Sequence, residues 1–217
     1  MTRQLNVVTW NVKGLNHPVK KKKVFTHLKQ FNPDITFLQE THLRSSDSIR
    51  LLRGWAGQHF HSTFEAKARG VSILISKDVP FESTKVTADK NGRYIIVSGK
   101  LFNTNVILAS VYAPNVEDVD FFVRLFSHLS DLGSHYLILG SDLNRCLDQV
   151  LDRSSSRPSV VSKSVTYIKS FISECGVSDV WRERNPDDRQ YSFFSHVHHS
   201  YTRIDYLLGL SKISILR

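Results

Sequence analysis

The sequence predicts an α/β domain in which two β-sheets pack face to face and helices cover the outside. Short apolar runs rich in Val, Ile, Leu, Phe and Tyr recur along the chain, and amphipathic helical patterns lie between some of them. Strand runs mixed with a few helices are typical of layered domains. The length of 217 residues suits one domain, 1–217, whose core is large enough to fold without disulfides or metal.

Several runs have the composition of strands that are buried on one or both faces. In chain order they span residues 5–11, 34–40, 70–76, 93–102, 105–115, 135–144 and 203–209. Helical spacing of apolar residues predicts helices between some of these strands. The first helix opens at Pro18 and ends before Asn32-Pro33, and its apolar stripe comprises Val24, Phe25, Leu28 and Phe31.

Two further helices are predicted over residues 117–132 and 162–174. Their apolar stripes comprise Val119, Phe122, Val123, Phe126 and Leu129 in the first, and Val165, Ile168, Phe171 and Ile172 in the second. The stretch SSSRPS at 154–159 is typical of a surface loop rather than a domain boundary.

Charge and cysteine usage narrow the class of protein. The net charge is +9 and the pI is about 9.6, which suits an anionic partner, most often nucleic acid, and equally suits a soluble protein whose surface is merely basic. Cys146 and Cys175 match no metal or redox spacing, so we expect a reducing, intracellular compartment, and the nucleus in particular. The N-terminal residues lack the apolar region of a secretory signal, and no run has the length of a membrane helix.

Polar side chains stand where the predicted strands stop. If these ends converge, carboxylate and amide oxygens meet at one rim of the fold, and such ligands suit Mg²⁺ or Mn²⁺ rather than zinc. Each residue alone has a local explanation, because Asn and Asp favour turns without any function. The recurrence of the pattern favours a shared site built from Asn11, Glu40, Tyr112 with Asn115, Asp142 with Asn144, and Asp205.

The motifs at these ends resemble the exonuclease III/AP-endonuclease branch of the DNase I-like superfamily. In order they are TWNVKGL (9–15), LQETHL (38–43), SVYAPN (110–115), LGSDLN (139–144) and RIDY (203–206). The segment 191–208 is most similar to the endonuclease domains of LINE retrotransposons. The resemblance implies a four-layered α/β sandwich and a Mg²⁺-dependent DNA endonuclease that leaves a 3′-hydroxyl, acting as a monomer when isolated and without a small-molecule cofactor.

The resemblance also implies roles around the metal and the attacking water. Glu40 is similar to the main metal ligand, and Asn11 to the residue beside it that supports the metal site. Asp142 resembles the group that aligns or deprotonates water, and Asn144 the residue that steadies that water; both are expected at the metal site. A divalent ion offsets the charge that builds on phosphate oxygens during cleavage, and a carboxylate activates the water.

Other residues are similar to those that contact the substrate. Tyr112 resembles a phenol that contacts the scissile phosphate, Asn115 shapes the adjoining loop, and Ser192 resembles a hydroxyl that contacts DNA phosphate. Asp205 is similar to the carboxylate that orients a catalytic histidine. The family carries that histidine in a following Ser-Asp-His strand, which is absent here, so we expect a C-terminally truncated domain with weak or absent cleavage.

Basic and aromatic residues outside the motifs predict a DNA-binding surface. Lys13 and the run Lys20–Lys23 precede scattered basic residues in predicted loops, namely Arg44, Arg50, Arg53, Lys67, Arg69, Arg93 and Arg145. The run 20–23 equally suits a solvated helix face. His196, His198, His199 and Tyr201 form a tip suited to a DNA groove, and the absence of a fourth ligand argues against zinc there.

Three functional interpretations stay open on the sequence. The preferred one is the nicking domain of a LINE-type retrotransposon, with a host repair enzyme as a lesser form of it. The second is a superfamily phosphoesterase acting on inositol phosphates, sphingomyelin or RNA tails. The third is a non-catalytic remnant that binds nucleic acid. The sequence gives neither the target site nor any preference for abasic DNA.

Overall fold

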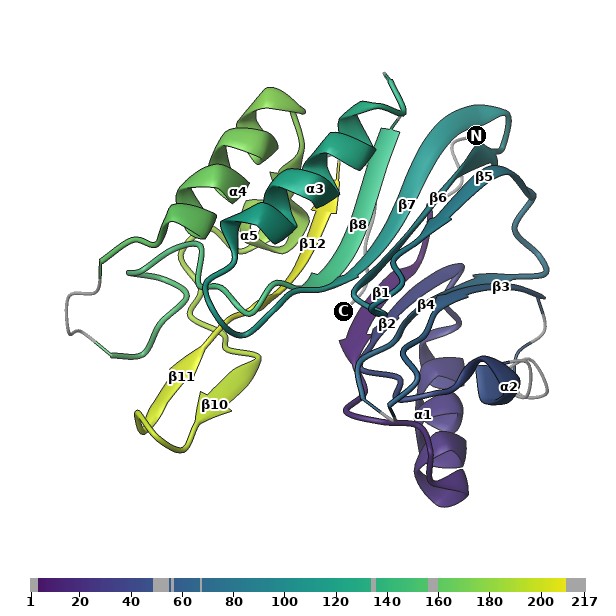
Figure 1. The fold of residues 1–217 in the computed structure, drawn as a ribbon, viewed down its shortest axis with the longest axis horizontal. Coiled ribbons are helices and arrows are strands. Elements are labelled where there is room, and N and C mark those ends of the chain that lie inside the picture. Colours follow the sequence, from purple (N-terminus) through teal and green to yellow (C-terminus); the bar gives the residue numbers. More distant parts are fainter. Residues whose placement is uncertain are drawn as a thin grey trace.

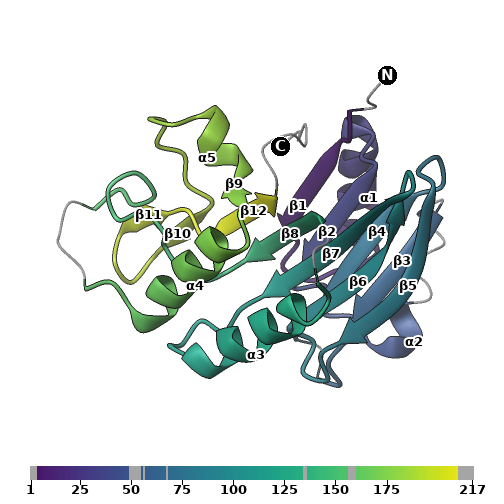
Figure 2. The same cartoon turned by 90° about the horizontal axis from the view of Figure 1, so that it is seen from above.

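The computed structural model describes residues 4–48, 55, 57–66, 68–133, 136–155 and 160–209. Two sheets lie face to face between helices, which gives four layers (Figure 1). Seen from above, α1 covers one sheet while α3 and α4 cover the other (Figure 2). No helix in the described part of the chain combines the length and apolar character needed to cross a membrane. The predicted sandwich is confirmed.

The smaller sheet has the strand order β1-β2-β4-β3. Its strands are β1 (Val7–Asn11), β2 (Ile35–Gln39), β3 (Gly57–Ser62) and β4 (Val71–Ser76). β1 and β2 are parallel because α1 (Pro18–Phe31) crosses between them, whereas β3 and β4 pair in the antiparallel sense. Parallel pairing of β1 and β2 brings Asn11 opposite Gln39, one residue before Glu40.

The larger sheet has the order β5-β6-β7-β8-β12-β9. It comprises β5 (Phe81–Ala88), β6 (Tyr94–Leu101), β7 (Thr104–Tyr112), β8 (Tyr136–Asp142), β9 (Ser178–Asp179) and β12 (Asp205–Gly209). β7 and β8 are parallel, connected through α3 (Val119–Ser130), and α4 (Lys163–Glu174) packs beside α3. Two short helices, α2 (Ser45–Ser48) and α5 (Val180–Arg184), lie in connections.

The core between the two sheets sets how closely they approach. Phe37 on β2 is fully buried against β8, where a Cβ on Gly140 would lie 2.5 Å from Cγ of Phe37. Only glycine fits there, because any side chain would push the sheets apart. Gln39 also bridges the sheets, donating from Nε2 to the Gly140 carbonyl over 3.2 Å. These contacts fix the two sheets at the end where the polar residues lie.

The predicted strands and helices are present with boundaries shifted by a few residues. Five strands lie outside the seven predicted runs, namely β3, β5, β9, β10 (Phe193–Ser195) and β11 (Ser200–Thr202). In α3 the predicted stripe was wrong at Val123, which is 41% exposed, because the buried face instead includes Phe121 and Leu125. Residues 156–159 of the predicted loop, the basic residues Arg50, Arg53 and Lys67, and the segment 211–217 lie outside the described residues.

A hairpin, β10 (Phe193–Ser195) and β11 (Ser200–Thr202), projects from the sandwich next to β12 (Figure 1). Its base is fixed by Arg203, which is only 1% exposed and donates to both Asp152 oxygens, over 2.8 Å from Nε and 2.9 Å from Nη2. Nη2 of Arg203 also donates to Asp179 over 2.5 Å. The ion pairs hold the chain rigidly two residues before Asp205.

Candidate active site

The predicted polar residues gather at one rim of the sandwich. Asn11, Tyr112 and Asp142 are the last residues of β1, β7 and β8, and Glu40 follows β2 directly. Tyr112 and Asp142 are register partners in the parallel ladder. Asp205 differs from the prediction in being the first residue of its strand, but β12 runs antiparallel to β8 and so places Asp205 opposite Asp142.

Asn11 links the two carboxylates of the site. Its Nδ2 donates to Oε1 of Glu40 and to Oδ2 of Asp142, over 2.8 Å in each case. Its Oδ1 accepts from the Lys13 backbone N–H over 3.0 Å. Both ends of the amide are engaged by protein, so Asn11 orients the two carboxylates, and its Oδ1 keeps one lone pair beyond the bond from Lys13.

Burial and charge shift the pKa values of two side chains at this rim. Burial, then the charge of Glu40, raises the pKa of Asp142, although hydrogen bonds from Asn11 and from the Asn144 backbone N–H oppose the change. Burial, together with the charge of Glu40 and a hydrogen bond to it, raises the pKa of Tyr112 to about 12. Tyr112 is therefore a neutral phenol at physiological pH and can donate a hydrogen bond to an anion.

The backbone around these residues is held in the left-handed region. Glu40 and His42 have φ of 51° and 56°, and Asn144 has φ of 50°. Each such conformation costs a non-glycine residue roughly 1–2 kcal/mol. Backbone hydrogen bonds enforce it, with Gly14 N–H donating to the Glu40 carbonyl over 2.6 Å and His42 N–H to the Arg69 carbonyl over 2.7 Å. Other left-handed residues, such as Phe102 and Asn103, lie in turns elsewhere, but at the rim this conformation coincides with polar side chains, as it often does at functional sites.

Arg145, for which the sequence predicts a DNA contact, supports the loop around Asn115. Its side chain is only 8% exposed. Nη1 donates to the carbonyls of Pro114 over 3.2 Å and Asn144 over 2.8 Å, and also contacts that of Asn115 over 3.4 Å. A guanidinium occupied in this way has no free face for phosphate. Asn144 adds a bond from Nδ2 to the Ala113 carbonyl over 2.9 Å, and Asn115 itself is exposed on the surface of this loop.

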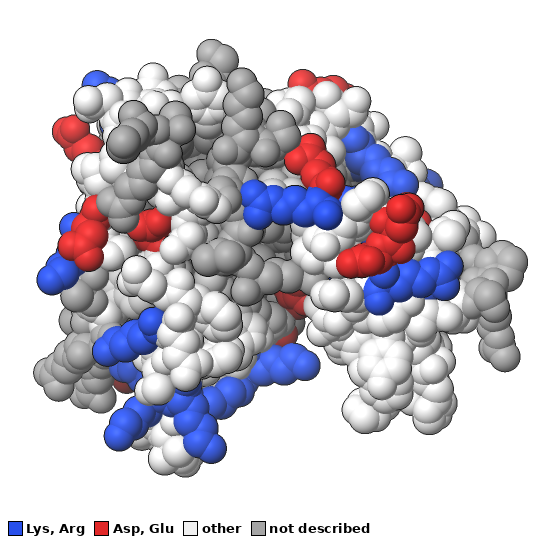
Figure 3. All heavy atoms as spheres, turned by 180° about the vertical axis from the view of Figure 1, so that it is seen from behind, with Lys and Arg blue, Asp and Glu red and all other residues white. Residues whose placement is uncertain are grey.

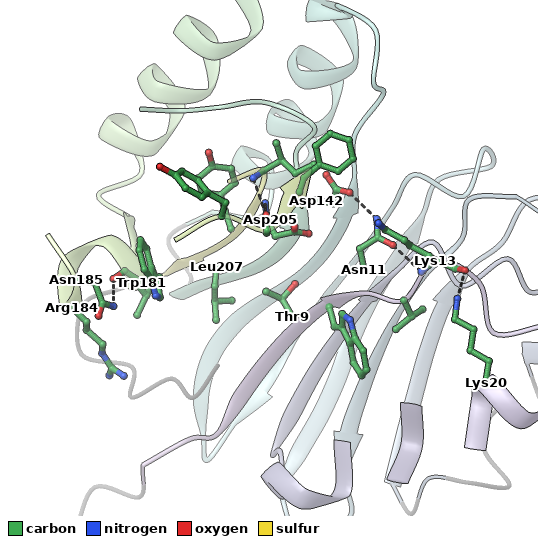
Figure 4. Close-up of a pocket in the computed structure, with 18 residues that line it drawn as sticks. Thr9, Asn11, Lys13, Lys20, Asp142, Trp181, Arg184, Asn185, Asp205 and Leu207 are labelled. Atoms are coloured by element: carbon green, nitrogen blue, oxygen red, sulfur yellow. Dashed lines mark hydrogen bonds between the residues drawn. The ribbon is translucent and has the colours of Figure 1, made fainter. Parts of the chain in front are cut away.

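A cavity of about 760 Å³ adjoins the site between β1 and β12. Figure 4 shows Asn11, Asp142 and Asp205 close together at its wall, with Trp181 and Arg184 at the far end. Ser192 also lines the cavity, and its Oγ accepts from the backbone N–H groups of Ile204 over 3.1 Å and Asp205 over 3.2 Å. The hydroxyl thus fixes the start of β12 while remaining exposed.

The imidazole of His42 contacts Glu40, a contact that sequence reasoning missed. Its Nε2 lies 3.2 Å from Oε2 of Glu40, so the Nε2–H tautomer donates to the second oxygen of that carboxylate. The signal was the spacing in QETHL, two residues beyond Glu40. His198 and His199 instead lie exposed in the turn of the hairpin and are not among the residues that line the cavity.

The donor set suits a magnesium-like ion bound together with substrate. Among the described residues, no group of three or more His, Cys, Asp or Glu side chains could hold a metal alone. Magnesium is commonly bound by one or two carboxylates, with water and phosphate oxygens completing its shell. Glu40 and Asp142 supply that pair, and the effect of Glu40 on the Asp142 pKa shows two negative charges close enough for a cation to relieve their repulsion.

Basic residues are unevenly placed around this rim. Viewed from behind, Lys and Arg side chains gather over the lobe that carries α1, whereas the protruding hairpin shows none (Figure 3). Residues 193–202 contain neither Lys nor Arg, and their exposed side chains include Phe193, Val197 and Tyr201. Tyr201 packs against Phe194 at 4.7 Å between ring centroids.

Comparisons with known proteins agree with this architecture. The model of the Endonuclease/Exonuclease/phosphatase family matches residues 8–209. The Transposon TX1 uncharacterized 149 kDa protein of Xenopus laevis is 29% identical over 210 residues, which are 93% of this chain. The chain spans 16% of the length of that protein.

Solved structures of AP endonucleases share the fold. LMAP from Leishmania major superposes with a TM-score of 0.74 at 17% identity, covering 97% of this chain and 80% of that one. The APE2 catalytic domain of Xenopus laevis gives 0.72 at 16% identity, covering 94% and 82%. An AP endonuclease from Archaeoglobus fulgidus gives 0.69 at 21% identity, covering 95% and 86%.

Proposed function

Because the chain belongs to the endonuclease/exonuclease/phosphatase family, we propose that it is a divalent-metal-dependent endonuclease domain that nicks DNA for a LINE-type retrotransposon. Hydrolysis leaves a 3′-hydroxyl. One observation carries the proposal, namely that Asn11 holds Glu40 and Asp142 within 2.8 Å of a single amide nitrogen at a strained rim. The transposon relative, the basic charge and the adjoining cavity support a nucleic-acid substrate.

The residues at the rim divide the work of phosphodiester hydrolysis. Glu40 and Asp142 would hold Mg²⁺ or Mn²⁺, which when bound offsets charge on the phosphate. Asp142 also orients the attacking water, and Asn144 steadies it. The neutral phenol of Tyr112 donates to a non-bridging phosphate oxygen, adding no charge that would repel a cation.

Residues farther from the carboxylates position the substrate. Asp205 stands opposite Asp142, where it would orient a catalytic histidine beside the leaving oxygen. Ser192 and Asn115 contact neighbouring phosphates. The hairpin tip, which lacks Lys and Arg and carries His198 and His199, enters a groove of DNA. The basic face over α1 (Figure 3) supplies affinity that is independent of the DNA sequence. We also propose that the domain works in the nucleus, where its substrate lies.

Nicking of supercoiled plasmid tests this function. In line with the weak cleavage expected from the sequence, we expect slow but measurable conversion to open circles with Mg²⁺ and none with EDTA. Glu40→Gln should nick at least about 100-fold more slowly still, since removing one metal ligand removes most of the charge stabilisation. Asn105→Ala, an exposed change on β7, serves as the control and should retain activity. Salt-sensitive DNA binding without nicking by the wild-type protein would contradict the proposal and favour a binding module.

A further inference from the structure

We infer that one nucleic-acid strand leaves the candidate active site over a row of basic side chains that binds its phosphates. We call this row the basic track; it consists of Arg93, Arg69, Lys90 and Arg44. The inference rests on the proposed function, because its ligand is the backbone of the substrate. It goes further in assigning a path and an end point, a second cavity of about 440 Å³ that lies away from the carboxylates.

The track begins at Tyr112, which is hydrogen-bonded to Glu40. The guanidinium of Arg93 lies over the Tyr112 ring, with Cζ 4.9 Å from the ring centroid. Its Nη1 donates to the Ala113 carbonyl over 3.3 Å, and the Tyr112 backbone N–H donates to the Arg93 carbonyl over 2.7 Å. Arg93 is therefore fixed beside a site residue, and the residue as a whole is half-buried.

Arg69 continues the track from Arg93. The Gly70 N–H donates to the Gly92 carbonyl over 3.0 Å, which holds the loops carrying the two arginines together, and a Cβ on Gly92 would lie 3.1 Å from the Gly70 nitrogen. The positive charge of Arg69, after burial, is the main cause that lowers the pKa of Arg93. Arg69 and Arg93 repel each other, and a phosphate bound between them would relieve that repulsion.

The second cavity completes the track. Arg69 stacks on Phe64, with Cζ 4.6 Å from the ring centroid, and Phe64 lines this cavity. The other lining residues supply cations, hydroxyls and a single carboxylate: Arg44, Lys90, Ser46, Thr63 and Glu65. They come from separate loops that meet here, and ammonium, guanidinium and hydroxyl donors are the groups that bind phosphate. The carboxylate of Glu65 repels an anion. Its removal should therefore change DNA binding in the direction opposite to the removal of a cation.

Binding of a labelled DNA duplex in EDTA tests the track without any chemistry. We expect Arg44→Gln, Lys90→Gln and Arg69→Gln each to weaken binding by about tenfold. Each change should also lower the slope of log K against log salt by about 0.9 for each phosphate that the variant no longer neutralises. Glu65→Gln should tighten binding. Arg124→Gln, on the exposed face of α3, is the matched control and should leave binding unchanged.

A second measurement locates the phosphates on the DNA. Neutral methylphosphonates are placed one at a time along each strand, and those over the track should weaken binding to the wild-type protein but have no further effect on Arg69→Gln. Lys22→Gln, an exposed change on α1, tests the alternative path. If the track variants bind like Arg124→Gln, or if only Lys22→Gln weakens binding, the track is refuted.

The two proposals fail separately. Wild-type protein that binds DNA without nicking it refutes the nuclease function, while the same binding series still decides the track. Wild-type protein that nicks DNA, with track variants unchanged in binding, refutes only the track. Arg44 and Lys90 are exposed, so their variants carry little risk of unfolding. Thermal melting shows whether Arg69→Gln is folded.

Discussion

Asn11 and Asp142 join the two sheets at the rim through a hydrogen bond of 2.8 Å from Nδ2 to Oδ2. The two residues are 131 positions apart and stand at the ends of β1 and β8. The same nitrogen donates to Glu40, so one neutral amide separates two carboxylates. The geometry of the site therefore depends on how the sheets are packed, and its electrostatics depend on one side chain.

Replacing Asn11 by Ala should destabilise the protein in a pH-dependent manner. Asp142 has a raised pKa in the folded state, so its ionisation opposes folding as pH rises above the unfolded value near 3.8. Loss of the amide raises that pKa further. Urea unfolding should show a deficit against wild type of about 1–3 kcal/mol at pH 7 and a smaller one at pH 5. An equal deficit at both pH values would contradict this account.

Arg145→Lys should lower the turnover of nicking without weakening DNA binding. Lysine cannot reproduce the fork of donors that holds the Pro114 and Asn144 carbonyls, so the loop carrying Asn115 shifts. We expect kcat to fall about tenfold or more, with the dissociation constant for DNA in EDTA unchanged. Weakened binding at unchanged kcat would restore the sequence-based assignment of Arg145 to DNA.

His42 should determine how tightly the site takes up a divalent ion. Its Nε2 fixes the outer oxygen of Glu40, and such supporting partners are commonly worth about 10–100-fold in metal affinity. Calorimetry with Mn²⁺ should show weaker binding by His42→Leu and recovery by His42→Gln, which can still donate. If His42→Gln and His42→Leu bind Mn²⁺ equally, the hydrogen bond to Glu40 has no such role.

Acid should destabilise the fold through His59. Burial, followed by the charge of His61, lowers the pKa of His59 from 6.5 to about 3, so its neutral form is kept in the folded state. The unfolded chain then takes up the proton first, and stability falls as pH drops from about 6.5 toward 3. His59→Gln, which keeps a partner for Ser72, should lose up to about 1.4 kcal/mol less per pH unit in urea unfolding.

The pH dependence of His59→Gln needs a control variant at a histidine outside the pair His59 and His61. His128→Gln, near the end of α3, should follow the wild-type pH dependence because His128 is exposed on a helix of the larger sheet, whereas β3 belongs to the smaller one (Figure 2). If His59→Gln also follows the wild-type curve, other groups cause the acid sensitivity.

The sequence predicted the buried strands well because their apolar runs are continuous. β2, β4 and β6 are buried along nearly their whole length, and such strands can be recognised by composition. β5 was missed because most of its residues are exposed at a sheet edge, and β3 because it carries His59 and His61 among polar neighbours. Edge strands are defined by their partners rather than by their own residues.

The same limit applies to the site. Residue type and position at strand ends were enough to predict that Glu40, Asp142 and Asp205 converge. Composition could not reveal that Arg145 points into its own loop, since an arginine among DNA-binding motifs looks the same whether its guanidinium faces carbonyls or solvent. His42 was missed because its role depends on a left-handed turn that brings it back over Glu40.

The left-handed residues at the rim set the stability of the backbone against the chemical groups that the rim carries. Glycine would relax the backbone at Glu40 and His42, yet it would delete the carboxylate and the imidazole that stand there. Substitutions selected only for stability would therefore remove these side chains from the rim and stabilise the sandwich. Glycine at Glu40 or His42 should raise the free energy of unfolding and, if the rim works as proposed, abolish nicking.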